Sequence, residues 1–119
     1  MTAQVSVVIP TFNRRRTLAE VLAALEVQQE APPFEILVVD DGSTDGTCEW
    51  LQQHPLRGPD HPLRPLRPVR VLRQANRGPA AARNRGVAEA AGAMVAFLGD
   101  DTVPEPGWLE RLLPHCADP

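Results

Sequence analysis

The sequence predicts an α/β fold, a three-layer αβα sandwich around an open and mostly parallel sheet. Short uninterrupted apolar runs are typical of strands buried on both faces, and helix-like patterns alternate with these runs. Two of the runs also end at a pair of adjacent carboxylates. The right-handed crossover rule puts helices on both sides of such a sheet. With 119 residues, the chain has the length of one domain or of part of one.

The first predicted strand covers Val5 to Ile9 and ends at "PTFNR", a loop at its carboxyl end. Thr17 is expected to cap the helix that follows, which should end before Pro32. Apolar residues at helical spacing predict one buried face on this helix: Leu18, Val21, Leu22 and Leu25.

The second predicted strand, Ile36 to Val39, stops at the carboxylates of Asp40 and Asp41. Ser43 or Thr44 is expected to cap the next helix. An acidic turn before a helix is one explanation of this pair. A ligand role gains weight because a later strand delivers a second acidic pair to the same edge of the sheet.

Residues 54–68 contain five prolines, four of them at every third position, which predicts an extended surface loop between a helix and the next strand. Its arginines, Arg57, Arg64 and Arg67, fit either a solvated basic loop or a grip on an anionic partner.

Alternation of apolar and charged residues from Val69 to Gln74 predicts a half-buried strand near the sheet edge. An alanine-rich helix should start near Pro79, end at Gly92, and pack closely on the sheet through its small side chains. The helix N-terminus together with nearby guanidinium groups could hold an anion, although each arginine could equally be solvated. These arginines are Arg77, Arg83 and Arg85.

The last predicted strand, Met94 to Leu98, is expected to be buried on both faces, and Gly99 ends it before Asp100 and Asp101. Two adjacent carboxylates repel each other unless a cation lies between them, so a hard divalent metal is a natural partner. A helix cap or turn is again the alternative. A short amphipathic helix is predicted to follow, with Trp108, Leu109, Leu112 and Leu113 on its apolar face.

The charge balance excludes several kinds of chemistry. Net charge is −3, and all 12 basic residues are arginine, which excludes a lysine base, a Schiff base and a phosphate-loop lysine. A mildly acidic chain does not indicate nucleic-acid binding.

No apolar run approaches the roughly 20 residues that cross a bilayer, and no signal peptide is recognised, so a cytoplasmic protein is expected. Cys48 and Cys116 are expected to be reduced.

Four segments in this order resemble the nucleotide-binding half of a family 2 glycosyltransferase with the GT-A fold. They are "VSVVIPTFNR", "ILVVDDGSTDGT", "NRGPAAARNRG" and "MVAFLGDDTVPEPGWLE". The resemblance covers nearly the whole chain, residues 1–119, apart from the proline-rich loop.

The resemblance implies roles for particular residues. The nucleobase and ribose pocket would be lined by Pro10, Thr11, Phe12 and Asn13. Asp41 would accept a hydrogen bond from the base, typically uracil, and Arg83 would touch the base or the diphosphate. Asp100 and Asp101 match the Asp-x-Asp motif, with Asp100 at the ribose and Asp101 on Mn²⁺ or Mg²⁺. Many members have a further Asp where this chain has Gly99, so the motif leaves open which of Asp100 and Asp101 is the main metal ligand.

The implied function is transfer of a sugar from a nucleoside diphosphate, typically UDP, to an acceptor hydroxyl with inversion. Inverting members use a downstream acid as the base, and none of Glu105, Glu110 and Asp118 is convincing in that role. We therefore expect a donor-binding part without the base and the acceptor half, inactive by itself, from a protein that could sit at the inner face of a membrane. The alternative is a non-catalytic nucleotide-sugar-binding module or inactive paralogue. A phospho-acceptor receiver domain is disfavoured because there is no lysine.

Overall fold

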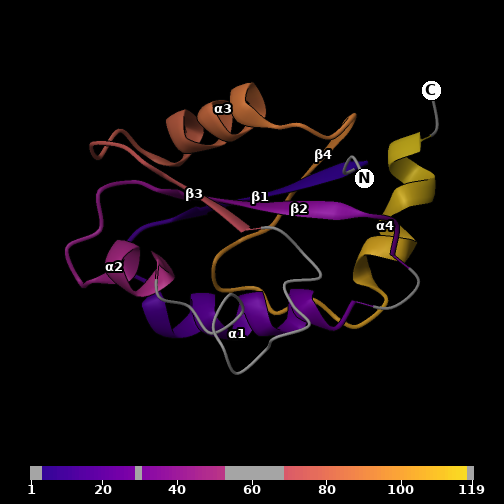
Figure 1. The fold of residues 1–119 in the computed structure, drawn as a ribbon, viewed down its shortest axis with the longest axis horizontal. Coiled ribbons are helices and arrows are strands. Elements are labelled where there is room, and N and C mark those ends of the chain that lie inside the picture. Colours follow the sequence, from indigo (N-terminus) through magenta and orange to yellow (C-terminus); the bar gives the residue numbers. More distant parts are fainter. Residues whose placement is uncertain (1–3, 29–30, 53–68, 118–119) are drawn as a thin grey trace.

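The computed structural model describes residues 4–28, 31–52 and 69–117. Strands and helices alternate along the chain (Figure 1). They are β1 (Val5–Thr11), α1 (Arg15–Glu26), β2 (Phe34–Asp40), α2 (Thr47–Gln52), β3 (Val69–Arg73), α3 (Pro79–Glu89), β4 (Met94–Phe97) and α4 (Trp108–Ala117). The predicted proline-rich surface loop, 54–68, lies outside the described residues.

The four described strands form one parallel sheet in the order β3-β2-β1-β4. Val5 pairs with Phe34 on one side and with Met94 on the other, so β1 is central. The chain adds β2 and β3 on one side of β1 and then places β4 on the other side, so the strand order reverses between β1 and β4. In open α/β sheets, ligands bind beyond the carboxyl ends of the strands at such a reversal, which directs attention to the residues that follow β1 and β4.

Helices cover both faces of the sheet, as the alternating pattern predicts. In Figure 1, α3 lies on one face and α1 and α2 lie on the other. Each face has its own apolar core, because successive strand residues point to opposite sides. The larger core joins the sheet to α1, with Val7, Ile9 and Leu22 among its members, and the smaller one packs Val8 and Leu37 against α3. The three-layer α/β prediction is confirmed.

Close contact between α3 and β1 depends on a glycine. A Cβ atom on Gly86 would lie 2.3 Å from the Cγ1 atom of Val8, which is closer than two carbons can approach. Ala82, one turn earlier on α3, is fully buried. The small side chains of this helix therefore let it lie directly on the sheet, as the sequence indicates.

Three predicted helix boundaries are wrong, namely the starts of α1 and α2 and the end of α3. Helix α1 begins at Arg15, and Thr17 lies in its first turn, where its Oγ1 donates to the Arg14 carbonyl oxygen at 3.2 Å. Helix α2 begins at Thr47 rather than directly after Thr44. There the Asp45 carboxylate accepts from the Thr47 backbone N–H at 3.1 Å. Helix α3 ends at Glu89, before Gly92.

The early end of α3 has a visible cause at the amino ends of the strands. The buried Glu35 carboxylate accepts from the Ser6 hydroxyl at 2.6 Å and from the Ala91 N–H at 2.7 Å. The Ser6 Oγ in turn accepts from the Gly92 N–H at 2.8 Å. These hydrogen bonds hold Ala91 and Gly92 outside the helix and fix the start of β4 beside β1.

Strand β4 is less buried than its apolar sequence predicts. Ala96 is buried, but Met94 and Val95 are only half-buried and Phe97 is 48% exposed. The reason is its position, because β4 pairs with β1 and is an edge strand of the described sheet. An apolar run of this length does not by itself distinguish a central strand from an edge strand.

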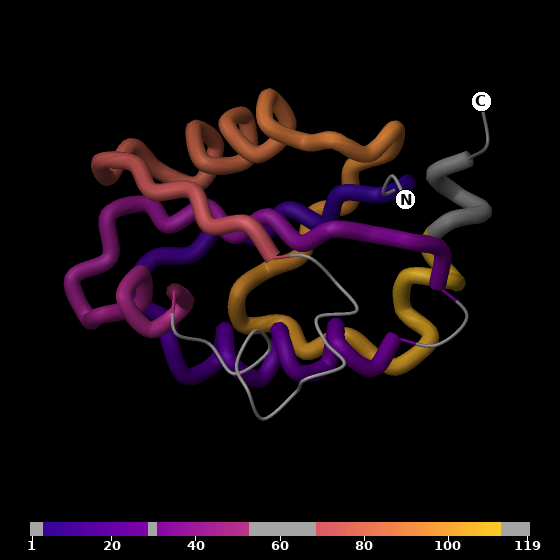
Figure 2. The backbone as a smooth tube through the Cα atoms, viewed as in Figure 1, coloured from indigo at the N-terminus to yellow at the C-terminus, as the bar shows by residue number. Residues whose placement is uncertain are grey.

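After β4 the chain returns to the far end of α1 before α4 begins (Figure 2). The Gln28 amide donates to the Glu105 carbonyl oxygen at 2.7 Å, and its Oε1 accepts from the Leu109 N–H at 2.9 Å. The loop that carries Asp100 and Asp101 is thus anchored at both ends, by β4 and by Gln28.

Candidate functional site

A pocket of about 470 Å³ opens at the carboxyl ends of β1, β2 and β4. This is the edge of the sheet at which the sequence predicts a ligand. The lining consists of Pro10, Thr11, Phe12, Arg14, Asp41, Asn76, Gly78, Pro79, Ala82 and Asp100. Residues from four separate segments therefore meet in one cavity.

Most of the predicted donor-site residues line this pocket. Pro10 and Thr11 end β1, Phe12 follows with 43% of its surface exposed, and Asp41 and Asp100 follow β2 and β4. An exposed aromatic side chain at a pocket wall offers a flat apolar surface to a planar ligand.

Three predicted residues are not in this lining, namely Asn13, Arg83 and the predicted metal residue Asp101. The Asn13 side chain accepts from the Thr44 N–H at 2.8 Å and borders a neighbouring pocket on the α1 side. Arg83 lines an adjoining pocket of about 230 Å³ whose walls include Pro10 and Asp100. Asn13 thus braces the loop after β1, and Arg83 lies within the same region of the surface as the acidic pair.

Asp41 is held in place by the segment between β3 and α3. Its Oδ1 accepts from the Gln74 amide at 2.9 Å and from the Arg77 N–H at 2.8 Å, and its Oδ2 accepts from the Gly78 N–H at 2.9 Å. Gly78 has a φ of 96°, a conformation that favours glycine, so its N–H can point at the carboxylate. Asp41 therefore shapes one wall of the pocket and also lines it.

The hydrogen bonds also decide the charge of Asp41. Burial raises the pKa of this carboxyl, but the bonds from Gln74, Arg77 and Gly78 lower it by more, and the pKa lies below its ordinary value. Asp41 is ionised at neutral pH and can only accept hydrogen bonds. One lone pair on Oδ2 remains for a donor group of a ligand.

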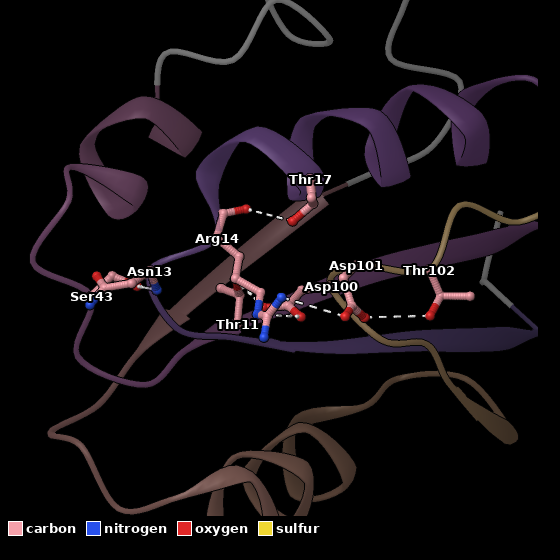
Figure 3. Close-up of polar contacts among 8 residues, drawn as sticks. All are labelled: Thr11, Asn13, Arg14, Thr17, Ser43, Asp100, Asp101 and Thr102. Carbon is pink, nitrogen blue, oxygen red and sulfur yellow. Dashed lines mark hydrogen bonds and ion pairs between the residues drawn. The ribbon is translucent and has the colours of Figure 1, made fainter.

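Of the second acidic pair, Asp100 lines the pocket together with Asp41, and Asp101 follows it directly in the chain. The Asp100 Oδ2 accepts from the Thr11 hydroxyl at 3.0 Å, and the Asp100 side chain is only 14% exposed (Figure 3). The Asp101 side chain is 52% exposed, and its Oδ1 accepts from the Thr102 hydroxyl at 3.5 Å. The two neighbours therefore differ, one built into the sheet edge and the other open to solvent.

The carboxylates at this edge fit a metal that shares its coordination with a ligand. Within residues 4–28, 31–52 and 69–117, no three His, Cys, Asp or Glu side chains come together closely enough to hold a metal ion. A complete protein cage of the kind that structural metals use is not found in this part of the chain. Mg²⁺ typically binds one or two carboxylates and completes its shell with substrate phosphates and water, and Asp100 with Asp101 matches that pattern.

Sequence reasoning missed several pocket residues, namely Arg14, Asn76, Gly78, Pro79 and Ala82 as lining residues. Arg14 is the most informative of these, because it is one of three consecutive arginines, Arg14 to Arg16. Nothing in the run itself shows which guanidinium faces the acidic pair. The end of β1 and the start of α1 decide this in the folded chain.

In a parallel α/β sheet, a pocket at the point of reversal is the place where small ligands bind. Residues 6–119 match the model of the family "Glycosyl transferase family 2", and the chain belongs to this family.

Curated relatives include glycosyltransferases from archaea and bacteria. Glycosyltransferase AglE of Haloferax volcanii is 35% identical over 108 residues, which are 90% of this chain and 33% of that protein. The pre-mycofactocin glycosyltransferase of Mycobacterium tuberculosis is 37% identical over 115 residues, 97% of this chain and 21% of that protein. The chain therefore spans about a third or less of the length of these relatives.

Solved structures of similar fold have been obtained with nucleotide sugars. The mannosyltransferase PcManGT of Pyrobaculum calidifontis, in complex with GDP-Man and Mn²⁺, superposes with a TM-score of 0.78 at 27% identity, over 100% of this chain and 34% of that one. S. aureus TarS 1-349 in complex with UDP-GlcNAc gives a TM-score of 0.74 at 30% identity, over 96% and 30% of the two chains. The GT-A fold is thereby confirmed. No helix in the described ranges has both the length and the apolar character needed to cross a bilayer.

Proposed function

We propose that this chain is the donor-binding part of a glycosyltransferase that binds a nucleoside-diphosphate sugar, with UDP as the preferred nucleotide, together with a divalent cation. The observation that supports this most is that Asp41, whose pKa lies below its ordinary value, lines the same pocket as Asp100. Asp41 suits a base with N–H donors, and the second acidic pair suits a ribose and a metal-bound diphosphate.

Asp41 is the proposed base-recognition residue. It is only 5% exposed, and its Oδ2 accepts one protein hydrogen bond, so it can also accept the imide N–H of uracil. A buried acceptor left unpaired by the wrong base costs binding free energy, which is how a site of this kind discriminates. Pro10, Thr11, Phe12 and Asn13 are proposed to support the base and ribose.

Asp100 and Asp101 are the proposed ribose and metal residues. Asp100 is oriented by Thr11 and is suited to accept from ribose hydroxyls. Asp101, the more exposed of the two, is suited to bind Mn²⁺ or Mg²⁺. When bound, the cation would stabilise the negative charge that develops on the departing diphosphate. Arg83, beside Asp100, is proposed to contact the base or the diphosphate.

Transfer to an acceptor needs a base that takes the proton of the attacking hydroxyl. Among the described acids after Asp101, Glu105 pairs with Arg111, and Glu110 lies on α4. The chain spans only 33% of the length of AglE. We therefore assign the base, the acceptor site and inversion to a part outside these 119 residues, and we expect the chain alone to bind donor without transferring sugar.

Calorimetric titration with UDP tests the metal role. UDP should bind with Mn²⁺ present and at least about tenfold more weakly with a chelator, and Asp101→Asn should remove most of that difference. Glu110→Gln is the matched control, since it removes an exposed acid of α4 and should leave UDP affinity unchanged. Equal UDP affinity with and without metal would eliminate the metal role of Asp101.

A second titration separates the two possible roles of Asp41. If Asp41 reads the base, Asp41→Asn should reduce the preference for UDP over CDP, because uracil presents an N3–H donor to the carboxylate whereas the N3 of cytosine is an acceptor. If Asp41 only anchors the segment of Gln74 to Gly78, both nucleotides should weaken by the same factor. An unchanged ratio of the two affinities would remove Asp41 from base recognition.

A further inference from the structure

The acidic pair already has a cationic partner within the chain, Arg14. The Arg14 Nε lies 3.7 Å from the Asp100 Oδ1, and the Arg14 Nη1 lies 3.5 Å from the Asp101 Oδ2 (Figure 3). One guanidinium thus faces both carboxylates, and it lines the same pocket. No role was assigned to this residue by the sequence patterns.

The backbone on both sides of Arg14 is fixed. Asn13 has a φ of 53°, and its N–H donates to the Ser43 Oγ at 2.9 Å. On the helix side, the Arg14 carbonyl oxygen accepts from the Leu18 N–H at 2.9 Å and from the Thr17 hydroxyl at 3.2 Å. The position of the Arg14 Cα is therefore determined by the fold, whereas its side chain is 53% exposed.

The carboxylate oxygens of the pair divide into two sets. The Asp100 Oδ2 is held by Thr11, and the Asp101 Oδ1 contacts Thr102. The other two oxygens, Asp100 Oδ1 and Asp101 Oδ2, both face Arg14. A metal ion held by the acidic pair would compete with the guanidinium for these two oxygens.

The contacts of Arg14 are weak enough to be exchanged. Both are long, and the Arg14 side chain is 53% exposed, so each ion pair is expected to contribute about 1 kcal/mol or less. Arginine keeps its charge at all relevant pH values, so a nearby metal ion is repelled as long as Arg14 stays. A divalent cation that arrives with an anionic ligand can overcome both effects.

The displaced side chain has a place to go. Arg14 also lines a neighbouring pocket of about 390 Å³, on the side of α1, with Arg15, Arg16 and Thr17. The Asp45 carboxylate borders this second pocket and offers another anionic partner. Arg14 borders both pockets from one backbone position, so a second site lies within reach of its side chain.

We propose that Arg14 is a further residue of the donor site, a resident counter-ion that competes with the divalent cation for Asp100 and Asp101. It makes binding of the metal alone weak. The anionic diphosphate favours the exchange, because it completes the coordination of the cation and offsets the positive charge that the cation brings to the pocket. Metal and nucleotide therefore bind cooperatively, and by linkage each raises the affinity for the other by the same factor. This inference rests on the proposed donor and metal site.

The competition is tested by titrating the chain with Mn²⁺ in the absence of nucleotide. Electron paramagnetic resonance measures the concentration of free Mn²⁺ at each step. Arg14→Ala and Arg14→Gln should each bind Mn²⁺ about three- to tenfold more tightly than the unsubstituted chain, from the loss of an ion pair and of charge repulsion. Arg16→Ala is the matched control, because it removes the same charge two residues away without touching the acidic pair. It should change the affinity by much less.

The same titration with saturating UDP tests the coupling. The ratio of Mn²⁺ affinities with and without UDP should be about three- to tenfold smaller in Arg14→Ala than in the unsubstituted chain. Adding Asp101→Asn to Arg14→Ala should abolish the tighter Mn²⁺ binding, which locates the ion at the acidic pair. Thermal unfolding of each variant checks that the fold is intact.

The two proposals fail in different ways. If UDP binds with Mn²⁺ but both Arg14 variants bind Mn²⁺ no more tightly than the unsubstituted chain, the role of Arg14 is overturned and the donor site stands. If UDP does not bind with Mn²⁺, the proposed function is overturned. Tighter Mn²⁺ binding that persists with Asp101→Asn, or that Arg16→Ala reproduces, also overturns the role of Arg14.

Discussion

The two ends of the sheet use carboxylates in opposite ways. At the amino ends of the strands, Glu35 is 5% exposed and accepts short hydrogen bonds of 2.6 and 2.7 Å from Ser6 and Ala91. At the carboxyl ends, Asp101 is half exposed and has partners no closer than 3.5 Å among the contacts of the described residues. A carboxylate whose oxygens accept short hydrogen bonds from the protein stabilises the fold. One with long, exposed contacts remains able to bind something else.

Asp41 stands between these extremes. It is buried and holds three hydrogen bonds, like Glu35, yet it lines the pocket, like Asp100. Its contribution to the fold and its proposed contribution to binding therefore have to be measured separately.

The largest effect should follow from removing the amino-end carboxylate. Glu35→Ala leaves the Ser6 hydroxyl and the Ala91 N–H without their acceptor and should lower the free energy of unfolding by about 2–3 kcal/mol, measured in urea. Asp101→Asn should change it by less than about 0.5 kcal/mol, because that side chain is exposed. Equal losses in the two variants would erase the contrast between the two ends.

The amino-end carboxylate should also contribute to the pH dependence of stability. Burial raises the pKa of Glu35, but hydrogen bonds from Ser6 and Ala91 and the charge of Arg70 lower it by more, so the pKa lies below its ordinary value of 4.5. The stabilisation is then complete above pH 4.5 and is lost as the pH falls through the folded-state pKa.

In Glu35→Gln, the stability measured by urea unfolding should therefore fall less steeply below pH 4.5 than in the unsubstituted chain. Some loss should persist, because the pKa values of Asp41 and Asp45 are also lowered. Parallel pH profiles for the two chains would show that Glu35 is not responsible.

A smaller effect is expected from removing the hydrogen bond that Asp100 accepts from Thr11. Thr11→Val keeps the shape of the side chain but removes the hydrogen bond to Asp100, and should cost about 1 kcal/mol in urea unfolding. The loss should lie between those of Glu35→Ala and Asp101→Asn, because Asp100 is largely but not wholly buried. A loss as large as that of Glu35→Ala would place Asp100 with the structural carboxylates.

Much of the fold could be predicted because it depends on local patterns. The apolar runs of β1 and β2 and the helical spacing of α1 are properties of short segments, and the structure confirms them. Helix ends were less predictable, because α3 stops where Glu35 and Ser6, distant in the sequence, capture the N–H groups of Ala91 and Gly92. The edge position of β4 was missed for a similar reason, since strand order depends on how the whole chain is connected.

The sequence by itself determined the alternating α/β plan, the two acidic pairs at strand ends and the family resemblance, because each is written in contiguous residues. Only the tertiary structure decided that Asp41 is anchored by the segment before α3, that Thr11 orients Asp100, and that Arg14 rather than Arg15 or Arg16 faces the acidic pair. These contacts join residues 37, 89 and 86 or 87 positions apart. Their geometry depends on strand pairing and on the exact turn at Asn13, which no local pattern specifies.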